Sequence, residues 1–112
     1  MLPKQVLKYI LDVESILEEI EKVKELYPSY SKFDADFLAK RTVERQLEII
    51  GEAINNIRKI DSNSNISSVK QIVNLRNLII HSYDTVDSAI LWGIIQKDIP
   101  KLKEELSVYR NL

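Results

Sequence analysis

The sequence has no cysteine, a single histidine, two glycines and three prolines among its 112 residues. Without cysteine the chain forms no disulfide framework and no thiolate metal site, and a lone histidine disfavours zinc, so we expect neither a metal nor another cofactor. No apolar run approaches the roughly 20 residues that a membrane helix needs. Lys8 and Asp12 interrupt the apolar positions near the N-terminus. This argues against a signal peptide, and we expect a cytoplasmic protein without membrane contact.

The charges nearly balance, with a formal net charge of −1. This value argues against a protein that coats nucleic acid through bulk electrostatics, so any contact with nucleic acid is expected to be local. Hydrophobic residues make up 45% and charged residues 29% of the chain, which is the balance of a soluble globular protein. We expect residues 1–112 to form a single domain, which at this length buries roughly two thirds of its unfolded surface.

Apolar residues recur at helical spacing in the first half of the chain and predict two long helices. The first covers residues 3–26 and ends there because Pro28 disfavours helical geometry in the residue before it. Its apolar stripe consists of Val6, Ile10, Val13, Leu17, Ile20 and Val23. The second begins between Asp34 and Asp36, either of which can cap it, and ends near Ile60. Its apolar stripe consists of Val43, Leu47, Ile50, Ile54 and Ile57.

The second half of the chain predicts two further helices. A third covers residues 67–80 after a polar turn at residues 61–65, and a fourth begins with Thr85 or Asp87 as its cap. The inward-facing residues expected in the fourth helix are Ile90, Leu91, Ile94, Ile95, Ile99, Leu102 and Leu106. Pro100 lies inside this pattern and predicts a kink, because it removes one main-chain hydrogen bond. The pattern predicts an all-α fold, an antiparallel up-down four-helix bundle.

The segment Arg76-Asn77-Leu78-Ile79-Ile80-His81-Ser82-Tyr83 carries the residues best suited to chemistry. A guanidinium such as that of Arg76 holds a phosphate by two parallel hydrogen bonds. The imidazole of His81 transfers protons near neutral pH. Together with the phenol of Tyr83, these groups form a candidate phosphodiester site. A lone histidine at a helix end more often caps the helix, so this segment alone leaves both interpretations open.

Two stretches resemble the HepT-like branch of the HEPN superfamily. One is Val43-Glu44-Arg45-Gln46-Leu47-Glu48-Ile49-Ile50-Gly51-Glu52-Ala53, which looks like the second-helix signature of that family. The other is the segment 76–83, followed by Val86-Asp87, Trp92 and Asp98-Ile99-Pro100. The similarity covers nearly the whole chain and is weakest in the first helix. Arg-x4-His alone is a weak signal, whereas its combination with these neighbours is specific.

The resemblance implies an all-helical homodimer that acts as the toxin of a type VII (HEPN/MNT) toxin–antitoxin pair. In that family the Arg-x4-His-x-Tyr motif carries metal-independent RNase activity, so Arg76 and His81 would be the catalytic pair. The usual antitoxin is a nucleotidyltransferase of the MNT type, which inactivates the toxin by adding AMP to the motif tyrosine, here Tyr83. The implied partners are RNA and such a nucleotidyltransferase, and further association of two dimers stays open.

Helical geometry separates Arg76 from His81 within one chain, since five residues at about 100° each place them roughly 140° apart. Either the helix loosens after Ile80, or two copies of the motif meet across a two-fold axis. The second arrangement supplies two histidines. Cleavage without a metal needs one group to take the proton from the 2′-OH and another to protonate the leaving oxygen, although water or Tyr83 is an alternative for one role. We expect the dimer interface to involve the third helix and part of the second or fourth.

Further residues are candidates for supporting roles. Asn77 lies one helical turn before His81, where it can orient the imidazole or contact a phosphate. Arg45 and Glu52 lie seven residues apart on one helical face. They are candidates for contacts to Arg76 or His81, with a plain solvated surface as the alternative.

Two remaining features each have two interpretations. Lys40, Arg41 and Arg45 form a small basic cluster that either steers RNA or the antitoxin or is a solvated helix face. Trp92 lies beside inward positions, which favours core or dimer packing over base stacking. The alternative function to an RNase is a non-catalytic helical dimer that binds nucleotide and serves as partner and substrate of a nucleotidyltransferase.

Overall fold

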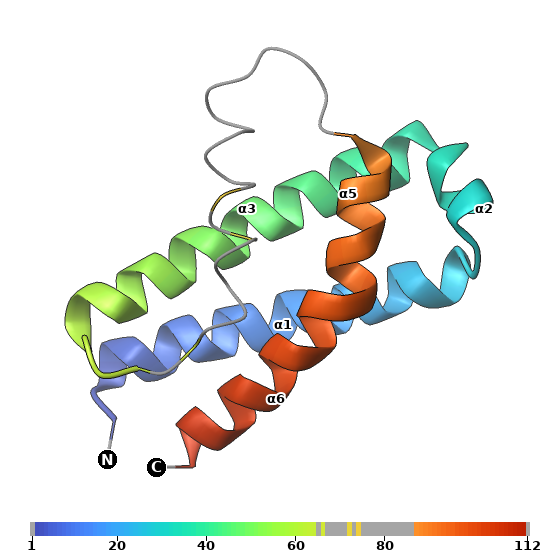
Figure 1. The fold of residues 1–112 in the computed structure, drawn as a ribbon. Helices are drawn as coiled ribbons and strands as arrows, with labels where there is room; N and C mark the ends of the chain where they lie inside the picture. The colour runs from blue at the N-terminus through green and yellow to red at the C-terminus, as the bar shows by residue number, and fades with distance from the viewer. Residues whose placement is uncertain (1, 65, 67–71, 73, 75–86, 112) are drawn as a thin grey trace.

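In the computed structural model, the protein is built from helices (Figure 1). The structure describes residues 2–64, 66, 72, 74 and 87–111. The elements in these ranges are the α-helices α1 (Lys4–Leu26), α2 (Tyr30–Asp34), α3 (Phe37–Ile60), α5 (Ser88–Gly93) and α6 (Ile99–Arg110), with the π-helix η1 (Ile94–Asp98) between the last two. No strand occurs in the described ranges, and the expected all-α class is confirmed. None of the described helices is long and apolar enough to cross a membrane.

The long helices α1 and α3 lie side by side and run in opposite directions (Figure 1). Every residue expected in their two apolar stripes is buried. The Asp36 carboxylate accepts the main-chain N–H groups of Leu38 at 2.9 Å and Ala39 at 3.3 Å, and it thereby caps α3. Both N–H groups lie in the first turn, where the helix itself offers them no acceptor, and the Asp36 side chain supplies one. The predicted boundaries of both helices agree with the structure to within a few residues.

The short helix α2 was not expected from the sequence. Its start is capped by the Ser29 hydroxyl, which accepts the N–H of Lys32 at 3.3 Å. It carries Phe33 into the core, where the Phe33 ring lies 5.4 Å from the ring of Trp92. A helix of five residues is too short to produce a repeating apolar pattern, so no periodicity reveals it.

The last helical segment contains a π-turn that the sequence did not predict as such. Asp87 caps α5 by accepting the N–H of Ala89 at 2.9 Å. Pro100 lies in the first turn of α6, where its missing N–H is tolerated. In the turn before it, the N–H of Ile99 bonds to the carbonyl of Ile94. The kink expected at Pro100 is therefore a π-turn that precedes the proline. The chain changes direction between α5 and α6 (Figure 1).

One expected inward position in this segment is wrong. Ile90 is 46% exposed, because α5 packs onto the core through its neighbour Leu91. The other six expected residues of the segment are buried. Helix α6 lies against α1, and Tyr109 adds a buried aromatic ring near its C-terminal end. Of the expected third helix, the described positions Ile72 and Asn74 are helical, and the expected turn after it lies outside the described residues.

Candidate functional site

The predicted site residues Arg76, Asn77, His81 and Tyr83 lie outside the residues that the structure describes. Their roles therefore stay predictions. The described residues form the scaffold on both sides of this segment in the sequence. Two groups of polar contacts hold that scaffold, one where the chain leaves α3 and one where it enters α5.

The first group of contacts lies at the C-terminal end of α3. The Tyr109 hydroxyl donates to the Asp61 carboxylate at 2.7 Å, which joins the end of α3 to α6. Burial, aided by this hydrogen bond to a carboxylate, raises the pKa of Tyr109 to about 12. Arg58 donates to the main-chain carbonyl of Ile66 at 3.1 Å. The chain that leaves α3 is thus fixed to two helices before it reaches residue 67.

The second group of contacts lies at the start of α5. The Ser88 hydroxyl donates to Asp34 Oδ1 at 2.5 Å and lies 2.9 Å from the Tyr30 hydroxyl. Lys40 Nζ lies 3.6 Å from the same Asp34 oxygen. The hydrogen bond from Ser88 is the main cause that lowers the pKa of Asp34, and the charge of Lys40 adds to it. These contacts attach the first residue of α5 to α2, five residues after Tyr83 in the sequence.

Trp92 packs at the same junction. Its ring lies 5.4 Å from that of Phe33 and 6.2 Å from that of Tyr30, and it is partly buried against the core. The interpretation of Trp92 as a packing residue is therefore confirmed.

A shielded stripe that contains two glutamates on α3 was missed by the sequence reasoning. Glu44 is only 7% exposed, and its carboxylate lies 3.4 Å from Arg41. Glu48 and Gly51 follow on the same helical face at 4-3 spacing, the first half-buried and the second buried. The sequence contains a signal for this stripe, because each of its positions lies one residue after a position of the apolar stripe of α3. A buried carboxylate needs a partner, and Arg41 supplies one.

The basic cluster at the start of α3 is not an uncompensated positive patch. Lys40 pairs with Asp34, Arg41 with Glu44, and Arg45 with Glu48 at 3.3 Å. Arg41 also lies 5.2 Å above the ring of Phe37. Each cation thus has an acidic neighbour, which weakens its long-range attraction for a phosphate backbone.

The predicted supporting residues Arg45 and Glu52 are not in contact with each other in any described interaction. The Arg45 side chain is 66% exposed and reaches Glu48. Glu52 is exposed and lines a shallow hollow of about 230 Å³ between α1 and α3, together with Tyr9 and Asp12. Their contacts to Arg76 or His81 stay predictions.

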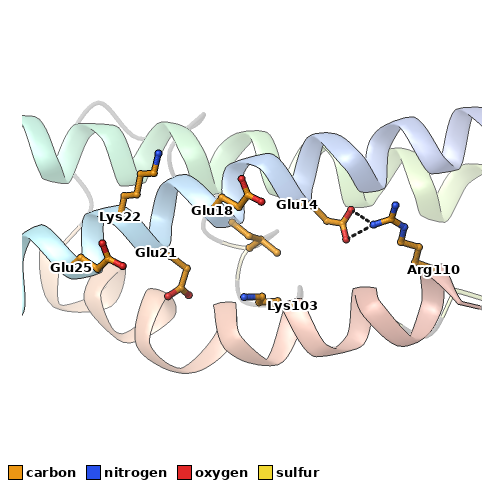
Figure 2. A pocket seen from close by; sticks show the side chains of 8 residues that line it. Glu14, Glu18, Glu21, Lys22, Glu25, Lys103 and Arg110 are labelled. Carbon is orange, nitrogen blue, oxygen red and sulfur yellow. Dashed lines mark hydrogen bonds and ion pairs between the residues drawn. The ribbon is translucent and has the colours of Figure 1, made fainter.

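A groove lined by described residues lies between α1 and α6 (Figure 2). It has a volume of about 510 Å³, and four glutamates of α1 line it: Glu14, Glu18, Glu21 and Glu25. Arg110 donates to both oxygens of Glu14, at 2.8 and 3.1 Å. The remaining carboxylates outnumber the lysines that line the groove. A negative groove repels a phosphate backbone, so this one is a poor candidate for RNA binding.

Comparison with known proteins identifies the class. The profile of the Ribonuclease HepT-like family matches residues 16–109. The chain is 35% identical to a "putative RNase" of Methanocaldococcus jannaschii over 96% of its own length and 99% of that protein. It is 33% identical to a "probable ribonuclease HepT" of Thermococcus cleftensis over 88% of its length and 93% of that protein. The chain belongs to the Ribonuclease HepT-like family.

A longer relative from Methanocaldococcus jannaschii is named "gamma-glutamylcyclotransferase and putative RNase". It is 36% identical over 81% of this chain, and the match spans 42% of its length. No solved structure matches the chain.

Proposed function

We propose that the protein is a metal-independent endoribonuclease that acts as the toxin of a type VII toxin–antitoxin pair. The observation that carries this proposal is the family match over residues 16–109, a range that includes the Arg-x4-His-x-Tyr motif at Arg76, His81 and Tyr83. The match to the "probable ribonuclease HepT" supports RNA as the substrate class.

In the proposed reaction, the 2′-oxygen of the RNA attacks the neighbouring phosphorus and the 5′-oxygen leaves. The His81 imidazole of one copy takes the proton from the 2′-OH, and the His81 imidazole of the second copy protonates the leaving oxygen. Arg76 stabilises the charge that develops on the non-bridging oxygens. Because each chain has one histidine, the active form is a homodimer in which two motifs face one cleft. Asn77 orients an imidazole or contacts the phosphate.

The described scaffold holds residues that flank the motif in the sequence. The Tyr109–Asp61 and Ser88–Asp34 hydrogen bonds hold the chain on either side of it to α6 and α2. A catalytic group misplaced by about 1 Å can cost on the order of 100-fold in rate. We therefore assign a positioning role to these two contacts.

The experiment that tests the RNase is cleavage of a labelled RNA in the presence of EDTA. The wild-type protein should cleave, while Arg76→Ala and His81→Ala should remain folded by circular dichroism and lose on the order of 10²–10³ or more in rate. Lys103→Ala, in the acidic groove far from the motif in sequence, is the matched control and should cleave normally. Cleavage by His81→Ala at the wild-type rate would refute the catalytic assignment. Binding of nucleotide without any cleavage by the wild type would favour the non-catalytic alternative.

The proposed control of the toxin is AMP addition to Tyr83 by an MNT-type nucleotidyltransferase. The phenol oxygen attacks the α-phosphorus of ATP, pyrophosphate leaves, and the tyrosine proton passes to solvent. The added anion would occupy the phosphate site beside Arg76 and exclude RNA by charge and volume.

Intact mass spectrometry after incubation with the nucleotidyltransferase and ATP tests this control. The wild type should gain one AMP, and Tyr83→Phe should gain none yet still cleave RNA. Tyr30→Phe removes a different tyrosine, which is exposed in the structure, and serves as the control that still accepts AMP. An unchanged mass gain in Tyr83→Phe would refute the assignment.

A further inference from the structure

Three exposed side chains form a row along one edge of α3. Phe37, Arg41 and Arg45 follow 4-4 spacing, which is the spacing of a ridge on a helix surface. Phe37 is 61% exposed, and the side chains of Arg41 and Arg45 are 50% and 66% exposed. We call these three residues the α3 ridge.

Each arginine of the α3 ridge is backed by a glutamate from the shielded stripe of the same helix. Arg41 Nη1 lies 3.4 Å from Glu44, and Arg45 Nη1 lies 3.3 Å from Glu48. The two glutamate side chains are only 10% and 23% exposed, so the carboxylates lie on the inner side of the arginines. A partner held inside the fold limits the positions that each guanidinium adopts, which lowers the entropy that ligand binding costs.

These ion pairs leave donors of each guanidinium available for a ligand. A guanidinium carries five N–H donors in a planar fork, and the contacts to Glu44 and Glu48 run through the Nη1 atoms. Arg41 and Arg45 are four residues apart, which is a rise of about 6 Å along a helix. This separation is comparable to that of successive phosphates along a nucleic-acid strand, so each arginine can bind one phosphate.

Phe37 extends the α3 ridge with an aromatic ring. The Arg41 guanidinium lies 5.2 Å from the centroid of this ring, which is a cation–π distance. The ring belongs to the first turn of α3 and is not part of the buried core. Unpaired bases stack on aromatic rings and on guanidinium planes in sites that bind single strands. An exposed ring beside a guanidinium therefore offers a base a place to stack.

We propose that the α3 ridge binds a single strand of RNA, with a base stacked on Phe37 and two successive phosphates bound by Arg41 and Arg45. The proposal rests on the RNase of the proposed function and assigns to it a strand-binding surface outside the Arg-x4-His-x-Tyr motif. A row of two cations and one aromatic ring is complementary to a polyanion that carries flat bases.

The α3 ridge begins near the described residue that follows the motif in the sequence. Arg41 comes directly after Lys40, whose Nζ lies 3.6 Å from the Asp34 oxygen that accepts the Ser88 hydroxyl. Ser88 comes five residues after Tyr83, and five residues of chain span about 18 Å at most. A strand of a few nucleotides covers such a distance, so one RNA can contact both the α3 ridge and the motif.

The neighbouring glutamates weaken the long-range attraction of the α3 ridge but leave direct contact with phosphate in place. The proposal therefore predicts a modest dependence of RNA binding on salt. Each phosphate neutralised in a single strand contributes about −0.7 to the slope of log K against log salt concentration. Loss of one arginine of the α3 ridge should make this slope less steep by about 0.7.

Fluorescence anisotropy of a labelled, single-stranded 2′-O-methyl RNA tests the stacking contact. This probe lacks the 2′-OH nucleophile, so the wild-type protein should bind it without cutting it. Phe37→Leu removes only an exposed ring and should remain folded by circular dichroism, while Kd rises roughly 5-fold or more, the low end for one stacked base. Phe37→Tyr keeps the ring and should bind like the wild type. A wild-type Kd for Phe37→Leu would overturn the proposal.

The same probe at several salt concentrations tests the phosphate contacts. Arg45→Gln should reduce the slope, whereas Arg45→Lys keeps the charge and should keep the slope. Arg110→Gln removes an arginine that pairs with Glu14 of α1, and as the matched control it should change neither Kd nor the slope. An unchanged slope for Arg45→Gln would contradict the proposed phosphate contact, and a wild type that does not bind the probe would refute the surface altogether.

Cleavage of the unmodified RNA in EDTA separates this proposal from the proposed function. Weaker probe binding by Phe37→Leu and Arg45→Gln, together with a raised KM for cleavage, supports both. The same weaker binding with no cleavage by the wild type keeps the α3 ridge as an RNA-binding surface and refutes the RNase. Cleavage by the wild type with unchanged probe binding by both variants refutes the α3 ridge and leaves the RNase proposal intact.

Discussion

The α1–α3 pair and the α5–η1–α6 segment contain similar apolar residues, but the two regions differ in how completely the fold buries these residues. In α1 and α3, every position of the apolar stripe is buried against another part of the same chain. In the other segment, a π-turn interrupts the helix, Ile90 is exposed, and no neighbour among the described residues requires glycine at position 93. Helical periodicity thus marks candidate buried positions, but it does not say which of them the fold buries.

The largest expected effect separates a buried from an exposed isoleucine. Ile50 is fully buried, so Ile50→Ala should lower the free energy of unfolding by about 2–5 kcal/mol through lost burial and the cavity left behind. Ile90→Ala should change it by less than about 0.5 kcal/mol at protein concentrations where the chain is monomeric. Urea unfolding followed by circular dichroism measures both. Equal losses would contradict the distinction between the two regions.

Tyr109→Phe tests the polar contact that joins the two regions. Loss of the hydroxyl leaves Asp61 without this donor and should lower the free energy of unfolding by about 1.5 kcal/mol near neutral pH. The folded pKa of Tyr109 is about 12, above the ordinary value of 10.0. Its contribution is therefore complete below pH 10 and is lost as the pH rises towards 12. The difference between wild type and Tyr109→Phe should shrink over that range, and a constant difference would contradict this account.

Gly93→Ala should stabilise the chain. Alanine favours a helix over glycine by about 1 kcal/mol, and its methyl group meets no atom within 4 Å. Thermal unfolding of dilute protein should show a higher midpoint. A lower midpoint at low concentration would show that the site has no free space.

Arg110→Gln should have the smallest effect. The ion pair of Arg110 with Glu14 is bidentate but about half exposed on the arginine side. Its loss should cost about 0.5 kcal/mol at low salt and less at 1 M salt, where exposed charges are screened. Urea unfolding at both salt concentrations measures the difference. A larger loss at high salt would contradict an electrostatic origin.

The sequence predicted the α1–α3 pair well because a single physical rule governs it. The 4-3 spacing of apolar residues determines which face is buried, and Asp36 caps α3 as one of two expected residues. The short helix α2 was missed because it lacks a full period, and its position depends on Ser29 and on the burial of Phe33. Ile90 was assigned inward because helical spacing does not by itself distinguish a buried position from an exposed one beside it.

The candidate site was predicted from chemistry and resemblance, and its geometry remains a prediction. Arg76 and His81 were selected by what a guanidinium and an imidazole can do, which requires no knowledge of the fold. The hydrogen bonds that hold the segments on either side of the motif were not predicted, because Ser88–Asp34 and Tyr109–Asp61 join residues about 50 positions apart. Single-sequence patterns carry no information on such pairs. Glu44 could have been found, since its stripe is visible in the sequence of α3.

The ion pair between Glu14 and Arg110 has a consequence for the order of folding. Its two residues are 96 positions apart, whereas α1 and α3 are separated only by a short connection that contains α2. Contacts between nearby segments form with less loop-closure entropy than contacts between distant ones. During synthesis, α1 and α3 can pair while α6 is still being made. The docking of α6 onto α1 then completes the molecule, and the Glu14–Arg110 contact is a marker for that last step.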